Sequence, residues 1–402
     1  MAGIIIIGAG QAGSSMAIKL RALGCGADIT LIGAEPVVPY QRPPLSKKYM
    51  LGEMDVERLY LRPEAFYSDK NINLVTGVSV TAIDRAAKIV TLETGAVLSY
   101  DMLALTTGSH PRTLPAAIGG DLSGVFTVRT LADADAMAPY FTEGKRALII
   151  GGGYIGLEAA AVAAARGVKV VLVEMADRIL QRVAAPQTSD YFRSLHTGRG
   201  VDVREGVGLS SLNGTDGHVT SATLTDGTTL DIDFAVVGVG ITPATELAEN
   251  IDLDVDNGIK VDELGRTSDP SIFAAGDCTS FPYRGDRIRL ESVPNAIEQA
   301  EATAGAMLGG TDQYHAKPWF WSDQYDVKLQ IAGLNSGYDH IVTRETDGAT
   351  SFWYYKGEQL LAVDAMNDPR AYMVGKRLIE AGRSPDPAAV ADPATELKTL
   401  LP

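Results

Sequence analysis

The chain has 402 residues, of which 35 are lysine or arginine and 50 are aspartate or glutamate, so its net charge at pH 7 is −15. This length predicts two or three domains, and a hydrophobic fraction of 46% excludes a disordered chain, a collagen and a coiled-coil rod. The negative charge argues against a surface that coats nucleic acid or an anionic membrane. No stretch approaches the roughly 20 apolar residues of a membrane helix.

The opening of the chain predicts strand, glycine turn, helix and strand, with strands at 4–7 and 29–32 and a helix at 14–23. Residues 36–50 are rich in proline and predict a shaped loop followed by a short helix. Residues 72–105 predict short strands with a hairpin near 94–95. Residues 146–174 repeat the opening pattern, with strands at 147–150 and 168–173, so the chain contains an internal duplication.

The second half predicts further strands and one long helix. A hairpin over 217–240 ends in a buried strand at 234–239, and a short strand at 272–275 precedes a helix at 295–308. From Trp319 aromatic residues gather and strands are predicted at 328–332, 351–355 and 359–363. The final segment, 385–402, is rich in proline and alanine, and we expect it to be loosely held.

Cysteine usage is sparse. Cys25 and Cys278 form no C-x-x-C or C-x4-C pair, so we expect no metal site, disulfide framework or local dithiol. The five histidines show no ligand spacing. The chain begins with an apolar strand and has no basic leader, so we expect no signal peptide and, with few cysteines, a cytoplasmic location.

The first glycine motif follows the first strand and opens a helix: Gly8-Ala9-Gly10-Gln11-Ala12-Gly13. In a G-x-G-x-x-G motif the glycines permit a tight turn, a close approach of pyrophosphate and close packing of helix on strand. The helix N-terminus then offers its amides to the phosphates. An acid is expected about 20 residues later to bind ribose. Glu35, 22 residues after Gly13, fits this spacing.

The second glycine motif, Gly151-Gly152-Gly153-Tyr154-Ile155-Gly156, lies in the same context. Glu174 ends the following strand, 18 residues after Gly156, and predicts a preference for NADH because an acid there repels a 2′-phosphate. Two alternatives stay open. Glu174 could only cap the strand end, and Arg178 or Arg182 could hold a 2′-phosphate.

Two dinucleotide motifs suggest a flavin and a nicotinamide that meet. Three more turns support this. A strand runs into Thr107-Gly108-Ser109, another ends in Gly276-Asp277, and residues 291–296 open a helix whose amides can face a flavin.

On these motifs the chain resembles the glutathione-reductase-like FAD/NAD(P) oxidoreductases. Within them it is similar to the NADH-dependent reductases of [2Fe–2S] ferredoxins, the type of putidaredoxin reductase and the reductases of biphenyl dioxygenases. The narrower signatures are Arg42–Lys47, Gly151–Glu158, Glu291–Asn295 and Trp319–Gln324. The resemblance implies an α/β fold with two Rossmann-like dinucleotide-binding domains and a C-terminal α+β domain. The expected limits are 1–109 with 242–318 for FAD, 110–241 for NAD and 319–402 for the C-terminal domain.

The resemblance implies FAD contacts at Gly8, Gly10, Ala12, Gly13, Ala34, Glu35, Arg42, Lys47, Val80, Thr107, Gly108, Arg129, Gly276, Asp277, Val293 and Trp321. One position departs from the family. Relatives usually place the ribose acid directly after the strand-end glycine, where this chain has Ala34, so the contact comes either from Glu35 or from the backbone. The expected NAD contacts are Gly151, Gly153, Tyr154, Ile155, Gly156, Glu174, Arg182 and Gly240.

Lys47 and Glu158 are the expected catalytic residues. The resemblance implies that the Lys47 ammonium lies near the flavin and pairs with Glu158, which could also bind the nicotinamide carboxamide. The alternative is a surface lysine and a solvated glutamate. Trp321 is expected at the flavin's exposed edge, although core packing is a fair interpretation for Trp319 or Trp321. No cysteine lies in the loop where disulfide reductases carry their dithiol, so electrons must leave the flavin directly. Cys278 is expected to be a buried filler.

The predicted function is transfer of electrons from NADH through FAD to a [2Fe–2S] ferredoxin that serves a cytochrome P450 or a Rieske oxygenase. Alternatives are a rubredoxin reductase, a flavin NADH oxidase, or a binding flavoprotein like the apoptosis-inducing factors. We expect a transient ferredoxin partner, no nucleic-acid or membrane partner, and a monomer or weak homodimer. Arg284, Arg287 and Arg289 form either a basic dock for an acidic ferredoxin or a solvated loop.

Overall fold

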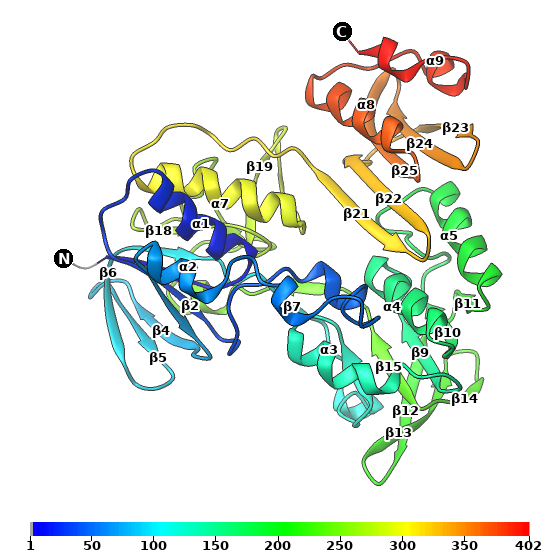
Figure 1. Cartoon of the computed structure of the whole chain (residues 1–402), viewed down its shortest axis with the longest axis horizontal. Helices are drawn as coiled ribbons and strands as arrows, with labels where there is room; N and C mark the ends of the chain where they lie inside the picture. The colour runs from blue at the N-terminus through cyan, green and yellow to red at the C-terminus, as the bar shows by residue number, and fades with distance from the viewer. Residues whose placement is uncertain (1–2, 402) are drawn as a thin grey trace. The chain divides into compact units, whose positions relative to one another are not determined.

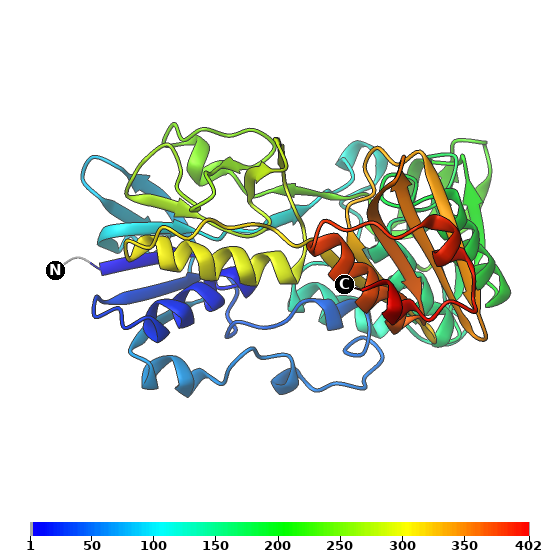
Figure 2. The same ribbon diagram turned by 90° about the horizontal axis from the view of Figure 1, so that it is seen from above.

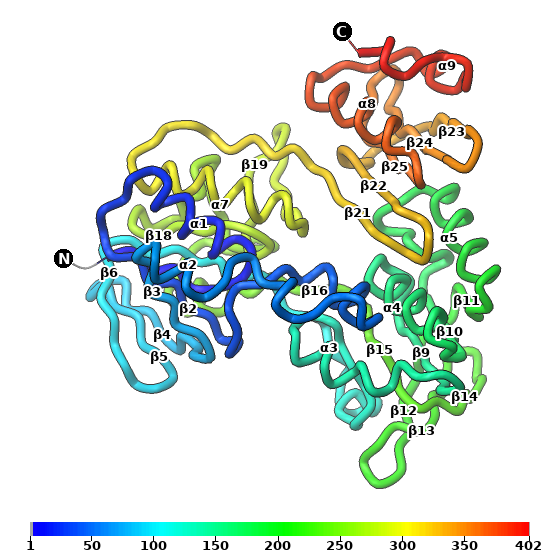
Figure 3. The backbone as a smooth tube through the Cα atoms, viewed as in Figure 1, coloured from blue at the N-terminus to red at the C-terminus, as the bar shows by residue number. Residues whose placement is uncertain are grey.

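The computed structural model describes residues 3–401, which form two compact units assembled from segments far apart in the sequence (Figures 1 and 3). The first unit comprises the described residues up to 41 with 55–110 and 242–318. The second comprises 42–54, 111–241 and the described residues from 319 onward. The limits of the three predicted domains stay a prediction. Segment 42–54, predicted with the FAD domain, packs in the second unit.

The first unit is built on a seven-stranded sheet of order β3-β2-β1-β6-β5-β4, with β18 paired to β6. The strands around β1 run parallel, whereas β4 and β5 pair antiparallel beside the start of β6. The strands are β1 (Gly3–Ile7), β2 (Ile29–Gly33), β3 (Ile72–Thr76), β4 (Val80–Asp84), β5 (Ile89–Leu92), β6 (Val97–Leu105) and β18 (Ile272–Ala274).

Helices cover one face of this sheet, where α1 (Gln11–Ala22) and α7 (Val293–Met307) lie side by side (Figures 1 and 2). The side chains of β1 alternate between faces, so Ile4 and Ile6 pack with these helices while Ile5 and Ile7 join a second core. The unit also contains α2 (Glu64–Asp69), α6 (Glu246–Glu249), a 3-10 turn η2 (Val56–Arg58), and a small sheet of β17 (Ile259–Lys260), β19 (Thr279–Tyr283) and β20 (Asp286–Ile288).

The second unit contains a parallel sheet of order β11-β10-β9-β15-β8. Its strands are β8 (Val125–Thr127), β9 (Arg146–Ile150), β10 (Lys169–Glu174), β11 (Asp202–Glu205) and β15 (Phe234–Val237), and its helices are α3 (Leu131–Met137), α4 (Tyr154–Ala165) and α5 (Pro186–Gly198). An antiparallel sheet of β12 (Leu209–Thr215), β13 (His218–Leu224) and β14 (Thr229–Asp231) packs on it. The predicted duplication of strand, glycine turn, helix and strand is confirmed.

Short strands and 3-10 turns link the larger elements. The chain crosses between the units within β7 (Ser109–Pro111) and β16 (Ile241–Pro243), among other places. The 3-10 turns of the second unit are η1 (Pro43–Ser46), η3 (Ala116–Ile118), η4 (Ala138–Tyr140) and η5 (Leu397–Leu400).

The C-terminal part of the second unit is an antiparallel sheet of order β21-β22-β25-β24-β23, against which α8 (Pro369–Glu380) packs (Figure 1). Its strands are β21 (Trp319–Gln324), β22 (Val327–Gly333), β23 (His340–Thr346), β24 (Ala349–Lys356) and β25 (Gln359–Met366). The strands predicted at 328–332, 351–355 and 359–363 are confirmed within β22, β24 and β25. Among residues 3–401, no helix is long and apolar enough to cross a membrane.

The expectation of a loosely held final segment is wrong for the described part of it. Residues 387–391 form α9 (Pro387–Ala391), and Val390 and Leu397 are buried. The physical reason is Arg344, which is 5% exposed and needs acceptors for its guanidinium. It donates hydrogen bonds to the backbone carbonyls of Val390, Asp392, Pro393 and Thr395. Pro402 lies outside the described residues.

A buried carboxylate joins α5 to the C-terminal sheet. Asp364 on β25 accepts a hydrogen bond from the Thr188 hydroxyl, with Oγ1 and Oδ2 2.7 Å apart, and another from the Tyr354 hydroxyl. The same tyrosine oxygen accepts a bond from the Ala185 amide, 3.1 Å away, at the start of α5. Burial raises the pKa of Asp364 to about 6, against the lowering effect of the two hydroxyl donors.

We expect Asp364→Asn to change how stability depends on pH. The pKa of Asp364 in the folded protein, about 6, lies above its ordinary value of 3.8, so folding favours the protonated carboxyl. That stabilisation is complete below pH 3.8 and is lost as the pH rises through 6. The free energy of unfolding of the variant, relative to the natural chain, should therefore rise by roughly 2–3 kcal/mol between pH 4 and 7.5. Urea unfolding at a series of pH values measures it.

Asp347→Asn is the matched control because Asp347 is an exposed carboxyl in the turn that joins β23 and β24 of the same sheet. Its difference from the natural chain should stay constant with pH. A constant difference for Asp364→Asn as well would contradict the assignment of a buried, protonatable group.

Candidate functional site

The glycine turn of the first unit is tightly packed at Gly8 and Gly13 and has free space at Gly10. Gly8 has φ +110°, and an ideal Cβ there would lie 2.2 Å from the carbonyl oxygen of Thr106. An ideal Cβ on Gly13 would lie 2.0 Å from the carbonyl oxygen of Gly8, so only glycine lets α1 pack this closely. At Gly10, by contrast, no described atom beyond its chain neighbours comes within 4 Å of an ideal Cβ.

The second unit repeats this geometry after β9. Gly151 has φ +103°, an ideal Cβ on Gly156 would lie 2.0 Å from its carbonyl oxygen, and the front of the turn at Gly153 is open in the described part of the chain. No side chain within residues 3–401 caps the N-terminus of α1 or α4. Each turn therefore presents uncapped amides and positive dipole to open space, which suits a pyrophosphate.

Further predicted residues gather where the parallel strands of the first unit end. Gly276, after β18, packs on α1, since an ideal Cβ on Gly276 would lie 3.0 Å from Cβ of Ala12. Asp277 accepts a hydrogen bond from the Ser109 hydroxyl, 3.3 Å away. The Thr107 hydroxyl donates to the carbonyl of Ala244 over 2.6 Å. The residues brought to this edge are Gly8, Gly10, Ala12, Gly13, Thr107, Gly108, Gly276 and Asp277.

Helix α7 is fastened to the Gly-Asp turn. Gln299 Oε1 accepts hydrogen bonds from the Gly276 amide at 2.8 Å and the Thr279 hydroxyl at 3.0 Å. Val293 is the first residue of α7, whose start is capped by Ser292. Val80, another predicted FAD residue, begins β4 and is half-buried.

Both candidates for the FAD ribose contact follow β2. Ala34 is exposed, whereas Glu35 is half-buried and its Oε2 accepts a hydrogen bond from the Tyr40 hydroxyl at 2.6 Å. The tyrosine thus fixes the carboxylate just beyond the strand end. Which of the two residues makes the contact stays a prediction.

Glu174 braces the second glycine turn. Its Oε2 accepts from the Gly152 amide at 2.7 Å and its Oε1 from the Ala176 amide at 2.8 Å. The carboxylate therefore does cap the strand end, and each oxygen keeps a second lone pair for a ribose hydroxyl. Arg178 is used internally, because its guanidinium donates to the Ser189 hydroxyl and to the carbonyl of Ala184.

Arg182 is the exposed arginine of this region, and its Nη2 lies 3.7 Å from an ideal Cβ on Gly240. Three large apolar side chains are also exposed here: Ile155, which is a predicted NAD residue, and Val239 and Met175, which neighbour predicted NAD residues. Met175 is 79% exposed. Apolar side chains exposed beside a phosphate-binding turn are typical of a surface that a planar group covers. Met175 and Val239 were missed in the sequence, although each directly neighbours a predicted residue.

A buried carboxylate organises the second unit's polar cluster. Helix α4 is apolar on nearly every side and leaves Glu158 only 2% exposed. Its Oε1 lies 3.0 Å from the Lys47 ammonium and accepts a hydrogen bond from the Ser322 hydroxyl at 2.7 Å. Its Oε2 accepts from the Ser46 hydroxyl, also at 2.7 Å. Neither residue of the predicted pair is solvated, since the Lys47 side chain is 13% exposed.

Burial is the strongest influence on the ionisation of Glu158. Burial raises the pKa of Glu158 above its ordinary value, and the Lys47 charge and the hydroxyls of Ser322 and Ser46 oppose that rise. The two serines were not predicted. Ser322 stands inside the Trp319–Gln324 signature, but its partner is 164 residues away in the sequence, so no local pattern indicates the bond.

The two tryptophans of β21 differ in their surroundings. The Lys47 ammonium lies 5.9 Å from the ring centroid of Trp321. Trp319 packs on the C-terminal core and lies 6.3 Å, between ring centroids, from Tyr372. The structure thus brings Lys47, Glu158 and Trp321 together and gives Trp319 the packing role.

The proline loop is fastened near α3. Arg42 Nη1 donates to the carbonyl of Arg129 over 2.7 Å, so two predicted FAD residues are in direct contact. The Tyr49 hydroxyl donates to Asp135 over 2.6 Å. These bonds hold the loop that carries Lys47.

Tyr154 opens α4 and its ring lies 5.1 Å from that of Phe320, between centroids. Its hydroxyl is buried and has no hydrogen-bond partner among residues 3–401. Burial, and then the charge of Asp364, raise its pKa well above the ordinary value. The phenol is therefore neutral.

Cys278 is confirmed as a buried filler, because it is fully buried and burial raises the pKa of its thiol. Within residues 3–401, no group of three or more His, Cys, Asp or Glu side chains is arranged to hold a metal ion.

The expected basic dock is largely used inside the first unit. Arg287 donates to the carbonyls of Val261 and Ser280, and Arg289 pairs with Glu291. Arg284 is exposed, with its guanidinium 5.2 Å from the ring centroid of Tyr283. Arg284 and Arg287 are both exposed, but the Arg287 guanidinium is held by backbone carbonyls, whereas that of Arg284 lies against a tyrosine ring.

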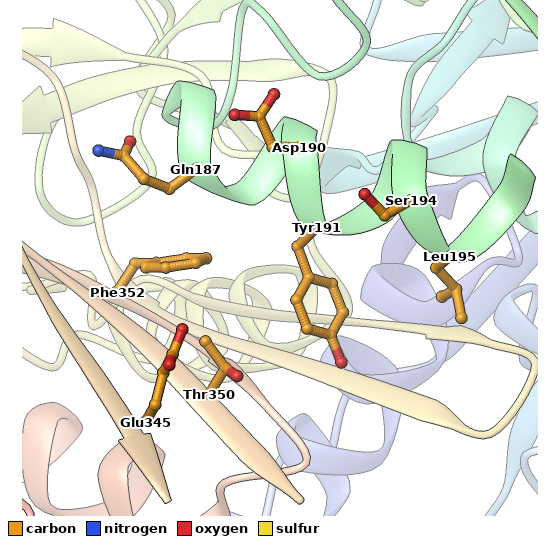
Figure 4. Close-up of a pocket in the computed structure, with 8 residues that line it drawn as sticks. All are labelled: Gln187, Asp190, Tyr191, Ser194, Leu195, Glu345, Thr350 and Phe352. Atoms are coloured by element: carbon orange, nitrogen blue, oxygen red, sulfur yellow. The ribbon is translucent and has the colours of Figure 1, made fainter. Parts of the chain in front are cut away.

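A groove of about 470 Å³ lies elsewhere in the second unit, between α5 and the strands β23 and β24 (Figure 4). Tyr191 of α5 and Phe352 of β24 lie in its wall. None of the predicted site residues lines this groove.

Comparison with known proteins shows the family of this chain. Residues 2–300 match the family model "Pyridine nucleotide-disulphide oxidoreductase", and residues 319–401 match "Reductase C-terminal". Rhodocoxin reductase of Rhodococcus erythropolis is 42% identical over 99% of this chain and 94% of its own. Putidaredoxin reductase of Pseudomonas putida is 41% identical over 99% of this chain and 96% of its own.

The fold is also found among solved structures. The reductase in a covalent putidaredoxin reductase–putidaredoxin complex matches with a TM-score of 0.96 and 40% identity, over 99% of this chain and 97% of that chain. The family's members use FAD and NAD(H), which fits one open glycine turn in each unit. The chain belongs to the pyridine nucleotide-disulphide oxidoreductase family, and it is a flavoprotein oxidoreductase with a reductase C-terminal domain.

Proposed function

We propose that this protein is an NADH-dependent reductase of a [2Fe–2S] ferredoxin. The observation that carries the proposal is the pair of matching glycine turns, one in each unit, together with a chain whose two cysteines offer no dithiol. FAD supplies the chemistry, because it accepts a hydride and gives electrons up one at a time. A one-electron acceptor such as a ferredoxin cluster suits an enzyme without a thiol relay.

The residues of each unit have separate tasks in this proposal. The turn at Gly8–Gly13, the acid after β2 and Asp277 would hold FAD through its phosphates and hydroxyls. The turn at Gly151–Gly156, Glu174 and Arg182 would hold NADH. Lys47 and Glu158 keep a buried ion pair. The predicted FAD contacts Arg42, Lys47, Arg129 and Trp321 belong to the second unit and stay predictions.

The finer parts of the proposal concern the cellular setting. We propose that the ferredoxin feeds a cytochrome P450 or a Rieske oxygenase, that the reductase is cytoplasmic, and that it is a monomer or weak homodimer with no nucleic-acid or membrane role. NADH-driven reduction of cytochrome c through an added [2Fe–2S] ferredoxin tests the main activity. Faster turnover with a rubredoxin, or equal turnover with oxygen alone, would indicate the alternative enzymes. Salt-sensitive DNA binding would indicate a binding flavoprotein.

Gly10 and Gly153 both have free space in front of them, so a larger side chain at either position can block one nucleotide site without the other. We expect Gly10→Val to abolish FAD retention, because the side chain would fill the space that a pyrophosphate needs. We expect Gly153→Val to leave the protein yellow and to raise KM for NADH at least tenfold, which is about 1.4 kcal/mol. Absorbance at the flavin bands and NADH–ferricyanide kinetics measure the two effects.

Gly26→Val is the control for this pair, since Gly26 is also open in the described structure. It should keep both FAD and normal KM. If Gly10→Val stays yellow and Gly153→Val loses its colour, the assignment of the two turns is reversed.

Nucleotide choice should depend on the charge of Glu174. Glu174→Gln keeps an oxygen for one of the two backbone amides but removes the repulsion of a 2′-phosphate. The ratio of kcat/KM for NADH over that for NADPH should fall about tenfold, or 1.4 kcal/mol. Equal use of both nucleotides by the natural enzyme would instead show that Arg182 controls the choice.

Partner docking should respond to Arg284. Charge reversal in Arg284→Glu should raise KM for ferredoxin several-fold at low salt and leave NADH–ferricyanide activity unchanged, because ferricyanide needs no protein interface. Arg266→Glu, an exposed arginine of the same unit, is the control for net charge. Equal effects of both variants would argue against a local dock.

A further inference from the structure

A chain of buried hydrogen bonds ends on the Glu158 carboxylate. Ser322 donates to Glu158, and Gln324 Nε2 lies 3.2 Å from the Ser322 oxygen. Gln324 Oε1 lies 2.8 Å from His196 Nε2, and His196 Nδ1 lies 3.3 Å from the Tyr325 hydroxyl. Ser322, Gln324 and His196 are all fully buried. These residues come from β21, the residue after it, and α5, all within the second unit.

The Glu158 carboxylate at the end of this series determines which group donates in each hydrogen bond. A carboxylate only accepts, so the single proton of Ser322 points to Glu158 and its oxygen must accept from the Gln324 amide nitrogen. Gln324 then turns its oxygen to His196, which must carry its proton on Nε2 and accept from Tyr325 on Nδ1. Burial lowers the pKa of His196, so its ring is neutral and this tautomer satisfies both nitrogens. All the dipoles therefore point at one charge.

The charges around the carboxylate are few. Among the side chains of residues 3–401, Lys47 is the one that forms an ion pair with it. On the elements packed against α4, Asp323 lies on the opposite face of β21 by strand alternation, and the carboxylate of Glu174 is bound to backbone amides. Arg146 and Lys169 are exposed at the starts of β9 and β10. The hydroxyl donors are thus the main support of the anion besides Lys47.

We propose that Ser322 is a positioning residue, backed by Gln324 and His196, which keeps the Glu158 carboxylate ionised and aimed at Lys47. The proposal rests on the proposed reductase function, in which Lys47 and Glu158 keep a buried ion pair. It gives the reductase C-terminal segment, 319–401, a part in the chemistry, because that segment supplies a hydroxyl to a carboxylate on the second glycine helix. The amide of Gln324 interrupts proton hopping, so the chain orients and stabilises rather than conducts protons.

The direct test is the titration of Glu158 in the FAD-loaded protein. Infrared spectra of protein with isotope-labelled glutamate show the carbonyl band of a protonated carboxyl, and the band missing in Glu158→Gln identifies this residue. We expect Ser322→Ala to move the midpoint upward by about one pH unit, since one hydrogen bond to the charged form is lost. Ser322→Thr keeps the hydroxyl and should restore the midpoint.

Ser351→Ala is the matched control. Ser351 is a fully buried serine of the same sheet that is hydrogen-bonded to Asp368 and Trp353, so its loss removes comparable contacts without touching Glu158. Its midpoint should equal that of the natural protein. If Ser322→Ala fails to fold, Gln324→Met can replace it, because this variant removes the hydrogen bond from Gln324 to Ser322. It should shift the midpoint of Glu158 in the same direction by a smaller amount.

The outcomes separate this proposal from the proposed function. An unchanged midpoint in Ser322→Ala, or in Gln324→Met where that variant has to be used, overturns the positioning role. A shifted midpoint with an unchanged pH profile of kcat/KM for NADH supports the positioning role and removes Glu158 from the reductase mechanism. A shifted midpoint with the acid limb of that profile moved by the same amount supports both.

Discussion

The second unit depends on how an almost completely buried carboxylate is kept as an anion. Glu158 lies on a helix with little other polarity, so its donors have to come from elsewhere in the chain. They come from the proline loop, through Ser46 and Lys47, and from β21, through Ser322. Removal of one donor leaves a buried charge partly unpaired, which costs more than the bond itself contributes. The loop, the helix and the strand are therefore held in register by one side chain.

Much of the fold could be predicted because its rules are local. A glycine that must adopt positive φ, such as Gly8, or that must let a helix approach a strand, such as Gly13, is visible in the sequence at fixed spacing. Buried strands such as β1 appear as short runs of isoleucine. The same rules gave the duplicated turn at Gly151.

The rest could not be predicted because it depends on contacts between distant segments. Ser46 and Glu158 are 112 residues apart, and neither residue has a local pattern that indicates the other. Asp364 is similar, since the burial that raises its pKa comes from tertiary packing. The arginines form a pattern that is visible in the sequence, but the pattern does not reveal their tertiary partners. A run of positive residues predicts a basic surface, yet the Arg287 guanidinium donates to backbone carbonyls of its own unit and Arg289 pairs with Glu291. A guanidinium has five N–H donors and can therefore bind several backbone carbonyls at once. For this reason a count of charged residues overstates the positive surface.

The four carbonyl acceptors of Arg344 have a consequence for the order in which the protein is made. The arginine lies on β23, and its acceptors lie 46 to 51 residues later in the sequence, so they are synthesised after it. Until they emerge from the ribosome, the guanidinium has to remain hydrated, and the sheet edge that buries it cannot close without an unpaired charge. Completion of the C-terminal sheet therefore waits for residues 390–395, whereas the parallel sheet formed by β8–β11 and β15 has all its strands available much earlier.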